Sequence, residues 1–258
     1  MIMKIKNFSI KSGGNKLNGV ILYHGTITPP ARTVIISHGF ASNMLITSPY
    51  AKPFLDAGYV VIMYDFCCSG SGISSGKSTQ MSVISEKNNL IDVLDYACRL
   101  DFVDSSHITL CGCSQGGFVS ALAAVECEDR IERLVMYYPA LCIPDDARRG
   151  CIIGTKIDTK NVPDKFFALF IRLGKKYVDD AFSLDPYEQI CSFKKPVLII
   201  HGIEDKLVKI DYSRRADELY GNSRLIEVHG DHGFIMKGLR ASCKATSEYL
   251  KKNDSSSV

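Results

Sequence analysis

The chain is most informative at Cys111-Gly112-Cys113-Ser114-Gln115-Gly116-Gly117, a stretch with the pattern Gly-x-Ser-x-Gly. An apolar run at 107–110 precedes it and a helix-compatible run at 118–127 follows it. A serine between a strand and a helix can sit on a turn sharp enough to project its Oγ out of the sheet. Gly112 and Gly116 have no Cβ, so strand and helix can approach closely around that turn. The stretch therefore predicts a strand, a serine-bearing turn and a helix in succession.

Apolar runs and helix-like stretches alternate along most of the chain. Strands are predicted at 33–37, 59–64, 108–111, 134–137, 196–200 and 224–228, and helices at 49–57, 83–100, 117–127, 210–220 and 234–250. Two further strands, 3–10 and 17–23, flank the turn Ser12-Gly13-Gly14-Asn15 and predict an antiparallel hairpin. This alternation, with Val/Ile/Leu-rich strands, indicates an α/β fold in which helices cover both faces of a mainly parallel sheet.

The alternation stops between Pro139 and Ile190. About fifty residues there lack strong strand signals and carry several prolines and glycines, which is too long for a structureless loop in a compact domain. We therefore expect an inserted cap at 139–190 between two parts of one core, 1–138 and 191–250. The polar tail at 251–258 is expected to be frayed.

Composition excludes several classes of function. The net charge is +3 and the basic residues are scattered, which argues against nucleic acid as a partner. No run approaches the roughly 20 apolar residues that cross a membrane, and the N-terminus carries no apolar stretch of signal-peptide length. The ten cysteines match no zinc pattern and favour a reducing compartment. We expect a cytoplasmic protein without a metal and without a membrane partner.

Two stretches imitate ligand sites. The glycine-rich residues 70–78 resemble a phosphate-binding loop, but Ser71 stands where that loop needs a glycine. We expect these glycines to shape a turn near Asp65. The pair Cys67-Cys68 has no accompanying His/Asp cluster, so a structural role is expected rather than a metal site.

A serine hydroxyl becomes a useful nucleophile only with a base to take its proton and a carboxylate to orient that base. In a sheet of this strand order the partners follow the serine, first the acid and then the histidine. Asp205 lies in His201-Gly202-Ile203-Glu204-Asp205, directly after the strand at 196–200. His232 lies in Gly230-Asp231-His232, after the strand at 224–228. We therefore predict a catalytic triad of Ser114, Asp205 and His232.

Neighbouring residues offer alternatives within these loops. Glu204 adjoins Asp205, but the Gly-x-x-Asp-x-x-Val spacing favours Asp205. His229 is the rival base, at the end of its strand. The oxyanion of the reaction needs two backbone N–H donors, and these are predicted at Gln115 and at Phe40 in the loop His38-Gly39-Phe40. His38 is expected to anchor that loop.

With these motifs the chain resembles the α/β-hydrolases, and more narrowly the bacterial cinnamoyl/feruloyl esterases. The likeness runs from about residue 20 to 250. The narrower part of the likeness lies at the start of the expected cap and within it, at Tyr138-Pro139-Ala140, Asp146-Ala147 and Leu173-Gly174-x-x-Tyr177. The resemblance implies that Asp146 and Tyr177 reach the phenolic hydroxyl of a hydroxycinnamoyl group, with Asp145 as the adjacent alternative. Two departures are Cys113, where the group commonly has histidine, and the lack of any tryptophan.

The resemblance implies hydrolysis of carboxylic esters through an acyl-serine, without a cofactor. A small-molecule ester is the expected substrate, with feruloyl or coumaroyl esters first. A short-acyl carboxylesterase, a lipase-like enzyme, a thioesterase and a peptidase use the same triad and stay open. The non-enzyme alternative is a binding protein on this fold that has lost catalysis. The N-terminal hairpin is a candidate exposed edge for a homodimer.

Overall fold

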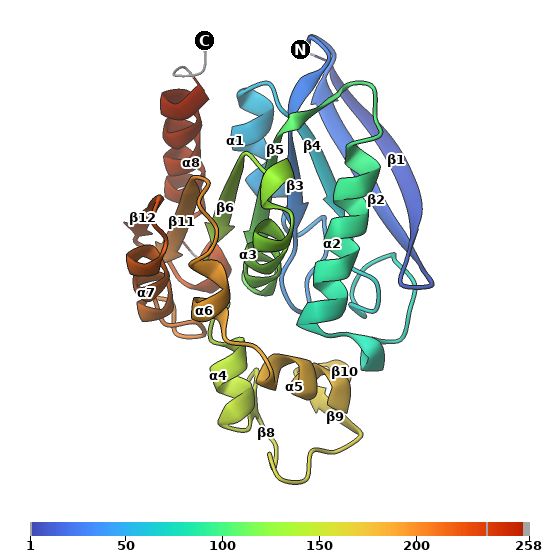
Figure 1. The fold of residues 1–258 in the computed structure, drawn as a ribbon, viewed down its shortest axis with the longest axis vertical. Helices are drawn as coiled ribbons and strands as arrows, with labels where there is room; N and C mark the ends of the chain where they lie inside the picture. The colour runs from blue at the N-terminus through green and yellow to red at the C-terminus, as the bar shows by residue number, and fades with distance from the viewer. Residues whose placement is uncertain (1, 236, 255–258) are drawn as a thin grey trace.

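An eight-stranded sheet forms the centre of the computed structural model, which describes residues 2–235 and 237–254 (Figure 1). The strand order is β1-β2-β4-β3-β5-β6-β11-β12. These strands are β1 (Met3–Ser12), β2 (Asn15–His24), β3 (Ala31–Ser37), β4 (Val60–Tyr64), β5 (Val103–Cys113), β6 (Arg133–Tyr137), β11 (Val197–Gly202) and β12 (Ser223–Val228). The pairs β1–β2 and β2–β4 are antiparallel and the remaining pairs are parallel. The predicted fold class and the leading hairpin are confirmed; use of the β1 edge in a homodimer stays a prediction.

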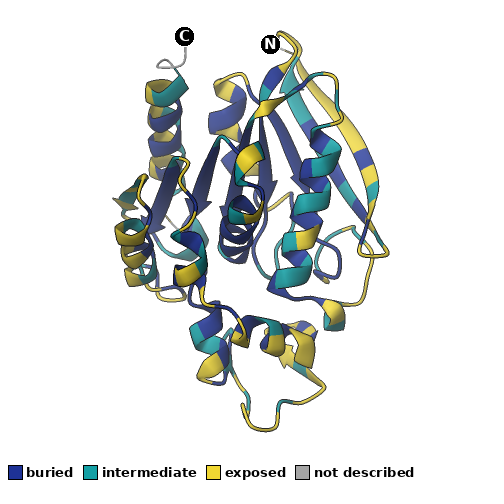
Figure 2. Cartoon of the chain, viewed as in Figure 1, coloured by how far each residue is buried: buried dark blue, intermediate teal, exposed yellow. Residues whose placement is uncertain are grey.

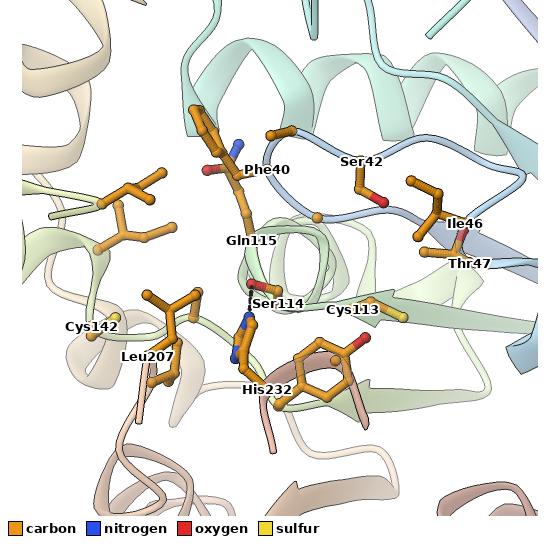
Figure 3. A pocket seen from close by; sticks show the side chains of 18 of the residues that line it. Phe40, Ser42, Ile46, Thr47, Cys113, Ser114, Gln115, Cys142, Leu207 and His232 are labelled. Carbon is orange, nitrogen blue, oxygen red and sulfur yellow. Dashed lines mark hydrogen bonds between the residues drawn. The ribbon is translucent and has the colours of Figure 1, made fainter. Parts of the chain in front are cut away.

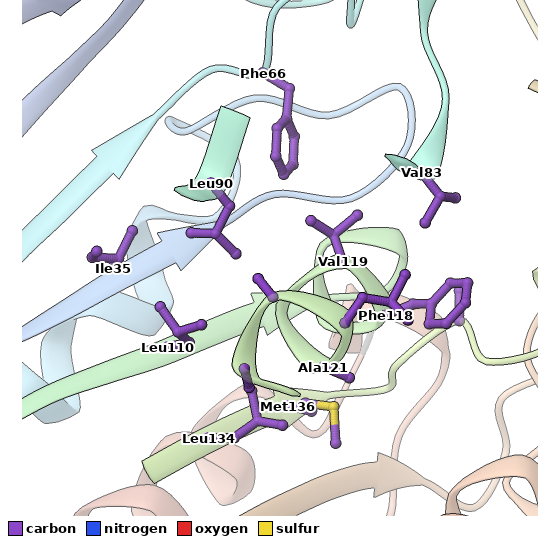
Figure 4. Packing of buried hydrophobic residues seen from close by; sticks show 14 of the residues in the cluster. Ile35, Phe66, Val83, Leu90, Leu110, Phe118, Val119, Ala121, Leu134 and Met136 are labelled. Atoms are coloured by element: carbon purple, nitrogen blue, oxygen red, sulfur yellow. The ribbon is translucent and has the colours of Figure 1, made fainter. Parts of the chain in front are cut away.

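Helices cover both faces of this sheet, as predicted. Alternate residues of one strand enter different cores. Ile35 packs with α2 (Val83–Ala97) and α3 (Gln115–Glu126), whereas Val34 packs with α1 (Lys52–Asp56) and α8 (Leu239–Asp254). Figure 4 shows Leu90 and Val119 from the two helices meeting Ile35 and Leu110 of the sheet. No helix in the described ranges is long and apolar enough to span a membrane. The helices outside the insert are η1 (Ser48–Ala51), α1 (Lys52–Asp56), η2 (Ser78–Gln80), α2 (Val83–Ala97), α3 (Gln115–Glu126), η3 (Glu128–Arg130), α7 (Asp211–Leu219), η4 (His232–Phe234) and α8 (Leu239–Asp254).

The segment between β6 and β11, which we call the insert, lies beyond the carboxyl ends of the parallel strands (Figure 1). Its elements are α4 (Ile143–Arg148), β7 (Cys151–Ile152), β8 (Thr155–Lys156), β9 (Lys165–Ala168), β10 (Ile171–Gly174), α5 (Lys175–Phe182) and α6 (Pro186–Ile190). The strands pair as two short antiparallel hairpins that the sequence pattern did not predict. Leu173 and Ala181 belong to the core under α2 and α3, while the outer side of the insert is exposed (Figure 2).

The C-terminal helix differs from its prediction at both ends. It begins at Leu239 instead of residue 234, because Gly233 and Gly238 have φ angles of 77° and 101° that interrupt a helix. It also continues through 251–254, where a frayed tail was predicted. The Asp254 carboxylate accepts a hydrogen bond from the Tyr59 hydroxyl at 3.0 Å and pairs with Arg133 at 2.8 Å. Because these partners are distant in sequence, the polar composition of 251–254 could not indicate that this segment is ordered. Residues 255–258 lie outside the described residues.

The glycine-rich stretch at 70–78 wraps around a buried carboxylate. Asp65 accepts hydrogen bonds from the backbone N–H groups of Met44 and Ile73, both at 2.8 Å. A Cβ on Gly72 would lie 2.4 Å from Cγ of Asp65, so only glycine fits there. The predicted turn near Asp65 is confirmed. Cys67 and Cys68 are buried free thiols.

Candidate active site

Ser114 occupies a strained turn between β5 and α3. Its φ of 53° and ψ of −120° lie outside the regions that side-chain-bearing residues normally adopt. A Cβ on Gly112 would stand 2.1 Å from the Gly116 carbonyl oxygen, and one on Gly116 would stand 2.3 Å from the His38 carbonyl oxygen. The close approach predicted for these two glycines is confirmed. The turn holds the serine at the edge of the sheet where the parallel strands have their carboxyl ends.

The structure brings the three predicted triad residues together from three separate loops. The Ser114 Oγ lies 3.0 Å from Nε2 of His232, and Nδ1 of His232 lies 2.7 Å from Oδ2 of Asp205. The other oxygen of Asp205 accepts hydrogen bonds from the backbone N–H groups of Leu207 and Val208, both at 2.9 Å. The carboxylate is thus fixed by its own loop while it holds the imidazole.

A second histidine, not assigned a role from the sequence, supports Asp205 from behind. The ring of His201 is buried, and its Nε2 lies 3.2 Å from Oδ2 of Asp205 and 3.0 Å from the Val208 carbonyl oxygen. Both neighbours are acceptors, so this nitrogen carries the proton, and Nδ1 lies 2.7 Å from the Ser213 hydroxyl. Burial alone would raise the pKa of Asp205, but hydrogen bonds from His201 and His232 outweigh it and hold the pKa below its usual range.

The rival residues form a separate cluster on the surface. The His229 side chain is 81% exposed, and its Nδ1 lies 3.1 Å from Oε1 of Glu204. Lys237 also contacts Glu204, at 2.8 Å. The Lys237 and His229 contacts lower the pKa of Glu204 to about 2. Neither rival lines the cavity beside Ser114.

Two tyrosines hold the loop that carries His232. The Tyr138 ring meets the imidazole edge-on, with centroids 4.8 Å apart. The Tyr138 hydroxyl donates to the Tyr50 hydroxyl at 3.0 Å, and Tyr50 in turn donates to the Gly233 carbonyl at 2.9 Å. These contacts limit rotation of the imidazole. Sequence reasoning did not single out either tyrosine for this role.

Both predicted oxyanion donors lie beside the serine. A Cβ on Gly39 would contact Cβ of Ser114 at 3.1 Å, so the loop that carries Phe40 passes directly over the turn. Gln115 is the first residue of α3, where backbone N–H groups have no partner within the helix and the helix dipole favours negative charge. Phe40, Ser114 and Gln115 line one cavity. This arrangement favours an anion next to the serine.

His38 anchors this loop as expected. Its Nδ1 donates to the Gly39 carbonyl at 2.8 Å, and its Nε2 accepts from the Phe66 backbone N–H at 3.1 Å. Burial lowers the pKa of His38, which keeps the ring neutral and suits one donor and one acceptor. His38 is therefore occupied with the backbone and is not a second base.

The Gln115 side chain belongs to a buried series of hydrogen-bonded polar groups. Its Nε2 donates to the Glu86 carboxyl group in α2 at 2.6 Å, and its Oε1 accepts from the Tyr177 hydroxyl in α5 at 2.6 Å. All three side chains are almost fully buried. Burial raises the pKa of Glu86 to about 8, although the hydrogen bond from Gln115 opposes the rise. These hydrogen bonds connect the insert to the first residue of α3.

A cavity of about 340 Å³ opens beside Ser114 and His232 (Figure 3). Its lining is mostly apolar, and the residues from the insert include Cys142, Ile143, Asp146, Ile153 and Leu169. Arg149 pairs with Oδ1 of Asp146 at 2.5 Å. The Cys113 thiol forms part of the wall, and burial raises its pKa to about 12, so it stays protonated beside the serine. A cavity of this size and polarity is typical of a small-molecule site.

The family model described as serine aminopeptidase, S33, matches residues 28–176. The chain belongs to this family of α/β-hydrolases. The match ends before Asp205 and His232, so their placement beside Ser114 is an independent structural observation.

Solved structures and a curated protein extend this relationship. Est1E from Butyrivibrio proteoclasticus, solved with ferulic acid bound, is 30% identical with a TM-score of 0.88, and the match covers 95% of this chain and 98% of that one. The esterase Pf2001 from Pyrococcus furiosus shares the fold, at 21% identity and a TM-score of 0.71 over 97% of this chain and 93% of that one. The uncharacterized protein YqkD from Bacillus subtilis (strain 168) is 26% identical over 90% of this chain and 76% of its own length. The protein is therefore an α/β-hydrolase.

The insert residues expected to meet a phenol have different fates in this hydrolase. Asp146 lines the cavity, whereas Tyr177 does not, because its hydroxyl donates to Gln115 in the interior. The contact of Tyr177 with a ligand stays a prediction, and it would require the hydroxyl to leave Gln115. The sequence could not show that Gln115 occupies the hydroxyl. The alternative, Asp145, lies outside the cavity lining and accepts from the Tyr212 hydroxyl at 3.0 Å.

Proposed function

We propose that the protein hydrolyses carboxylic esters through an acyl-serine intermediate at Ser114. The observation that carries the proposal is the hydrogen-bonded series from Ser114 to His232 to Asp205, with separations of 3.0 and 2.7 Å. His232 takes the serine proton as Oγ attacks the ester carbonyl, and the ionised Asp205 stabilises the resulting imidazolium. The backbone N–H groups of Gln115 and Phe40 stabilise the oxyanion of the tetrahedral intermediate.

The second half of the reaction uses the same groups. His232 returns its proton to the leaving alcohol, which departs as the acyl-serine forms. Water then enters, gives a proton to His232 and attacks the acyl carbon, and the serine recovers its proton as the acid is released. The net reaction consumes one ester and one water and yields one acid and one alcohol.

The acyl group is proposed to be aromatic, with hydroxycinnamates such as ferulate as the preferred class. The insert side of the cavity is apolar except for Asp146, which supports a ring with one polar substituent at its far end. Arg149 binds Oδ1 of Asp146, and a carboxylate has acceptor sites left for a phenol hydroxyl. The similarity to Est1E, whose structure holds ferulic acid, points the same way.

A general short-acyl carboxylesterase is the second candidate. It is favoured by the engagement of Tyr177 with Gln115, which leaves Asp146 as the lone predicted phenol partner in the cavity. An inactive binding protein on this fold is a third possibility, although such a protein would have no reason to keep the serine and histidine in hydrogen-bond contact.

Kinetics with two esters test the proposal. We expect wild-type protein to show a higher kcat/KM for methyl ferulate than for methyl butyrate, and Ser114→Ala to remove both activities while the fold persists. Asp146→Asn should lower kcat/KM for methyl ferulate more than for the butyrate. Asp145→Asn is the matched control, since Asp145 lies outside the cavity. Residual activity in Ser114→Ala would exclude the mechanism, and preference for butyrate would favour the second candidate.

A fluorophosphonate probe separates enzyme from binding protein. The probe labels a serine only when a base activates it, so wild-type protein should be labelled and Ser114→Ala should not. Absence of labelling in the folded wild type would support the inactive binding protein.

A further inference from the structure

The cavity extends beyond Ser114 on the side away from the insert. Figure 3 places Ser42, Ile46 and Thr47 on one side of Ser114, and Cys142 and Leu207 on the other. We call the first side the outer wall. It comprises Ser42, Ile46 and Thr47, together with Tyr50 of η1, Gly233, whose carbonyl accepts from Tyr50, and Ile235, which packs against Gly233. The segments around Tyr50 and Gly233 are joined, because Tyr50 donates to the Gly233 carbonyl at 2.9 Å.

The outer wall presents little polarity to a ligand. None of its six residues is charged, and two of its three hydroxyl groups are already engaged. Thr47 donates to the Met44 carbonyl at 3.3 Å, and Tyr50 donates to the Gly233 carbonyl. A sugar buried here would lose water from several hydroxyl groups without regaining hydrogen bonds, which disfavours its binding.

Two large apolar side chains of the outer wall are exposed to solvent. Ile46 is 62% exposed and Ile235 is 82% exposed. Ile235 also packs close to Gly233, since a Cβ there would lie 3.3 Å from its Cγ1. Two isoleucines that border one cavity and remain exposed are suited to close around an apolar group.

The reaction chemistry decides which half of an ester lies on this side. The leaving oxygen must be within reach of His232, which protonates it, and the outer wall includes Gly233, the residue directly after that histidine. The acyl group is assigned to the opposite side, which holds Asp146. The alcohol group therefore extends along the outer wall, which includes Ile46 and Ile235.

We propose that the outer wall is the alcohol subsite and that it selects esters of apolar alcohols, with an alkyl or aryl group, over sugar esters. This inference rests on the proposed function and deepens it by naming the alcohol class. Ile46 and Ile235 are the specificity-determining residues.

An alcohol series with a constant acyl group tests the subsite. Methyl, ethyl, propyl and butyl ferulate are compared with a feruloyl glucose ester, and kcat/KM is measured for each. We expect kcat/KM to rise with each added methylene, by up to about fourfold for a fully buried one, and to be lowest for the glucose ester. In Ile46→Ser and Ile235→Ser the loss should grow along the series and reach tenfold or more for butyl ferulate.

Ile73→Ser is the matched control, because Ile73 is 67% exposed but does not line the cavity. It should leave the slope of the alcohol series unchanged. Equal or better turnover of the glucose ester would overturn the proposal. The proposal would also be overturned if the loss of kcat/KM in Ile46→Ser grew with the length of the acyl group, measured with acetate, butyrate and hexanoate esters of one alcohol. The outer wall would then hold the acyl group.

The outcomes also separate this inference from the proposed function. Fluorophosphonate labelling and Ser114-dependent hydrolysis with a flat alcohol series would refute the subsite alone. Hydrolysis that survives Ser114→Ala would instead refute the serine mechanism on which the subsite rests.

Discussion

Replacing Glu86 by glutamine should make the protein more stable than wild type at pH 8 and not at pH 5. Glu86 is 2% exposed, and Gln115 donates to its carboxyl group at 2.6 Å. Glutamine has nearly the same shape and keeps an acceptor oxygen for Gln115, but it has no proton to lose. The substitution thus isolates the cost of ionising a buried carboxyl group.

The size of the effect follows from the pKa of Glu86, which is about 8 in the folded protein against a model-compound value of 4.5. Between these values the unfolded chain has lost the proton while the folded protein retains it, so stability falls as pH rises. The favourable contribution is complete below 4.5 and is lost as pH rises through 8. Each pH unit in this window costs about 1.4 kcal/mol, which gives about 4 kcal/mol between pH 5 and pH 8.

Urea unfolding followed by circular dichroism measures the free energy of unfolding of both proteins at pH 5, 6, 7 and 8. The difference between Glu86→Gln and wild type should grow in favour of the variant by about 4 kcal/mol across this range. Glu248→Gln is the control, because the Glu248 side chain is 65% exposed on α8. Its difference from wild type should not change with pH in this way.

A constant difference between Glu86→Gln and wild type from pH 5 to pH 8 would refute the reasoning. It would mean that Glu86 has the same protonation in the folded and unfolded states, and hence that water or a cation reaches the carboxyl group. The hydrogen bonds from Glu86 through Gln115 to Tyr177 would then be accessible to solvent.

Three further perturbations follow from the same contacts. Tyr177→Phe leaves the Gln115 amide oxygen buried without its donor, so it should lower the free energy of unfolding by about 1–3 kcal/mol. We expect equal losses of kcat/KM on methyl ferulate and 4-nitrophenyl butyrate. A loss confined to methyl ferulate would instead support direct binding of the phenol by Tyr177. Asp205→Asn should lower kcat on 4-nitrophenyl butyrate by about 10⁴-fold, and a loss under tenfold would remove Asp205 from the triad. The variant should also melt at a lower temperature, because an amide NH₂ would face groups that donate to the carboxylate. Asp254→Ala removes a partner from buried Arg133 and should cost about 3 kcal/mol in urea unfolding, whereas no change would indicate a frayed end.

Local patterns in the chain were sufficient for the fold and for the choice of the three residues that meet at the proposed active site. The glycines around Ser114, the position of Asp205 and His232 just past strands, and their order along the chain each depend on a few neighbouring residues. Strand ends at one edge of a parallel sheet converge, so residues placed by local pattern meet there without further information. This is why the 3.0 Å contact between Ser114 and His232, 118 residues apart, could be anticipated.

Only the tertiary structure decided which polar groups are already satisfied. Tyr177 meets Gln115 across 62 residues, and Tyr59 meets Asp254 across 195. Nothing local marks such pairs, because a hydroxyl or carboxylate looks the same in sequence whether its partner is a ligand, water or another side chain. Desolvation makes burial without a partner costly, so the packed fold selects the partner. The sequence alone thus identified the proposed triad, and the packing of the insert determined which of its side chains line the cavity.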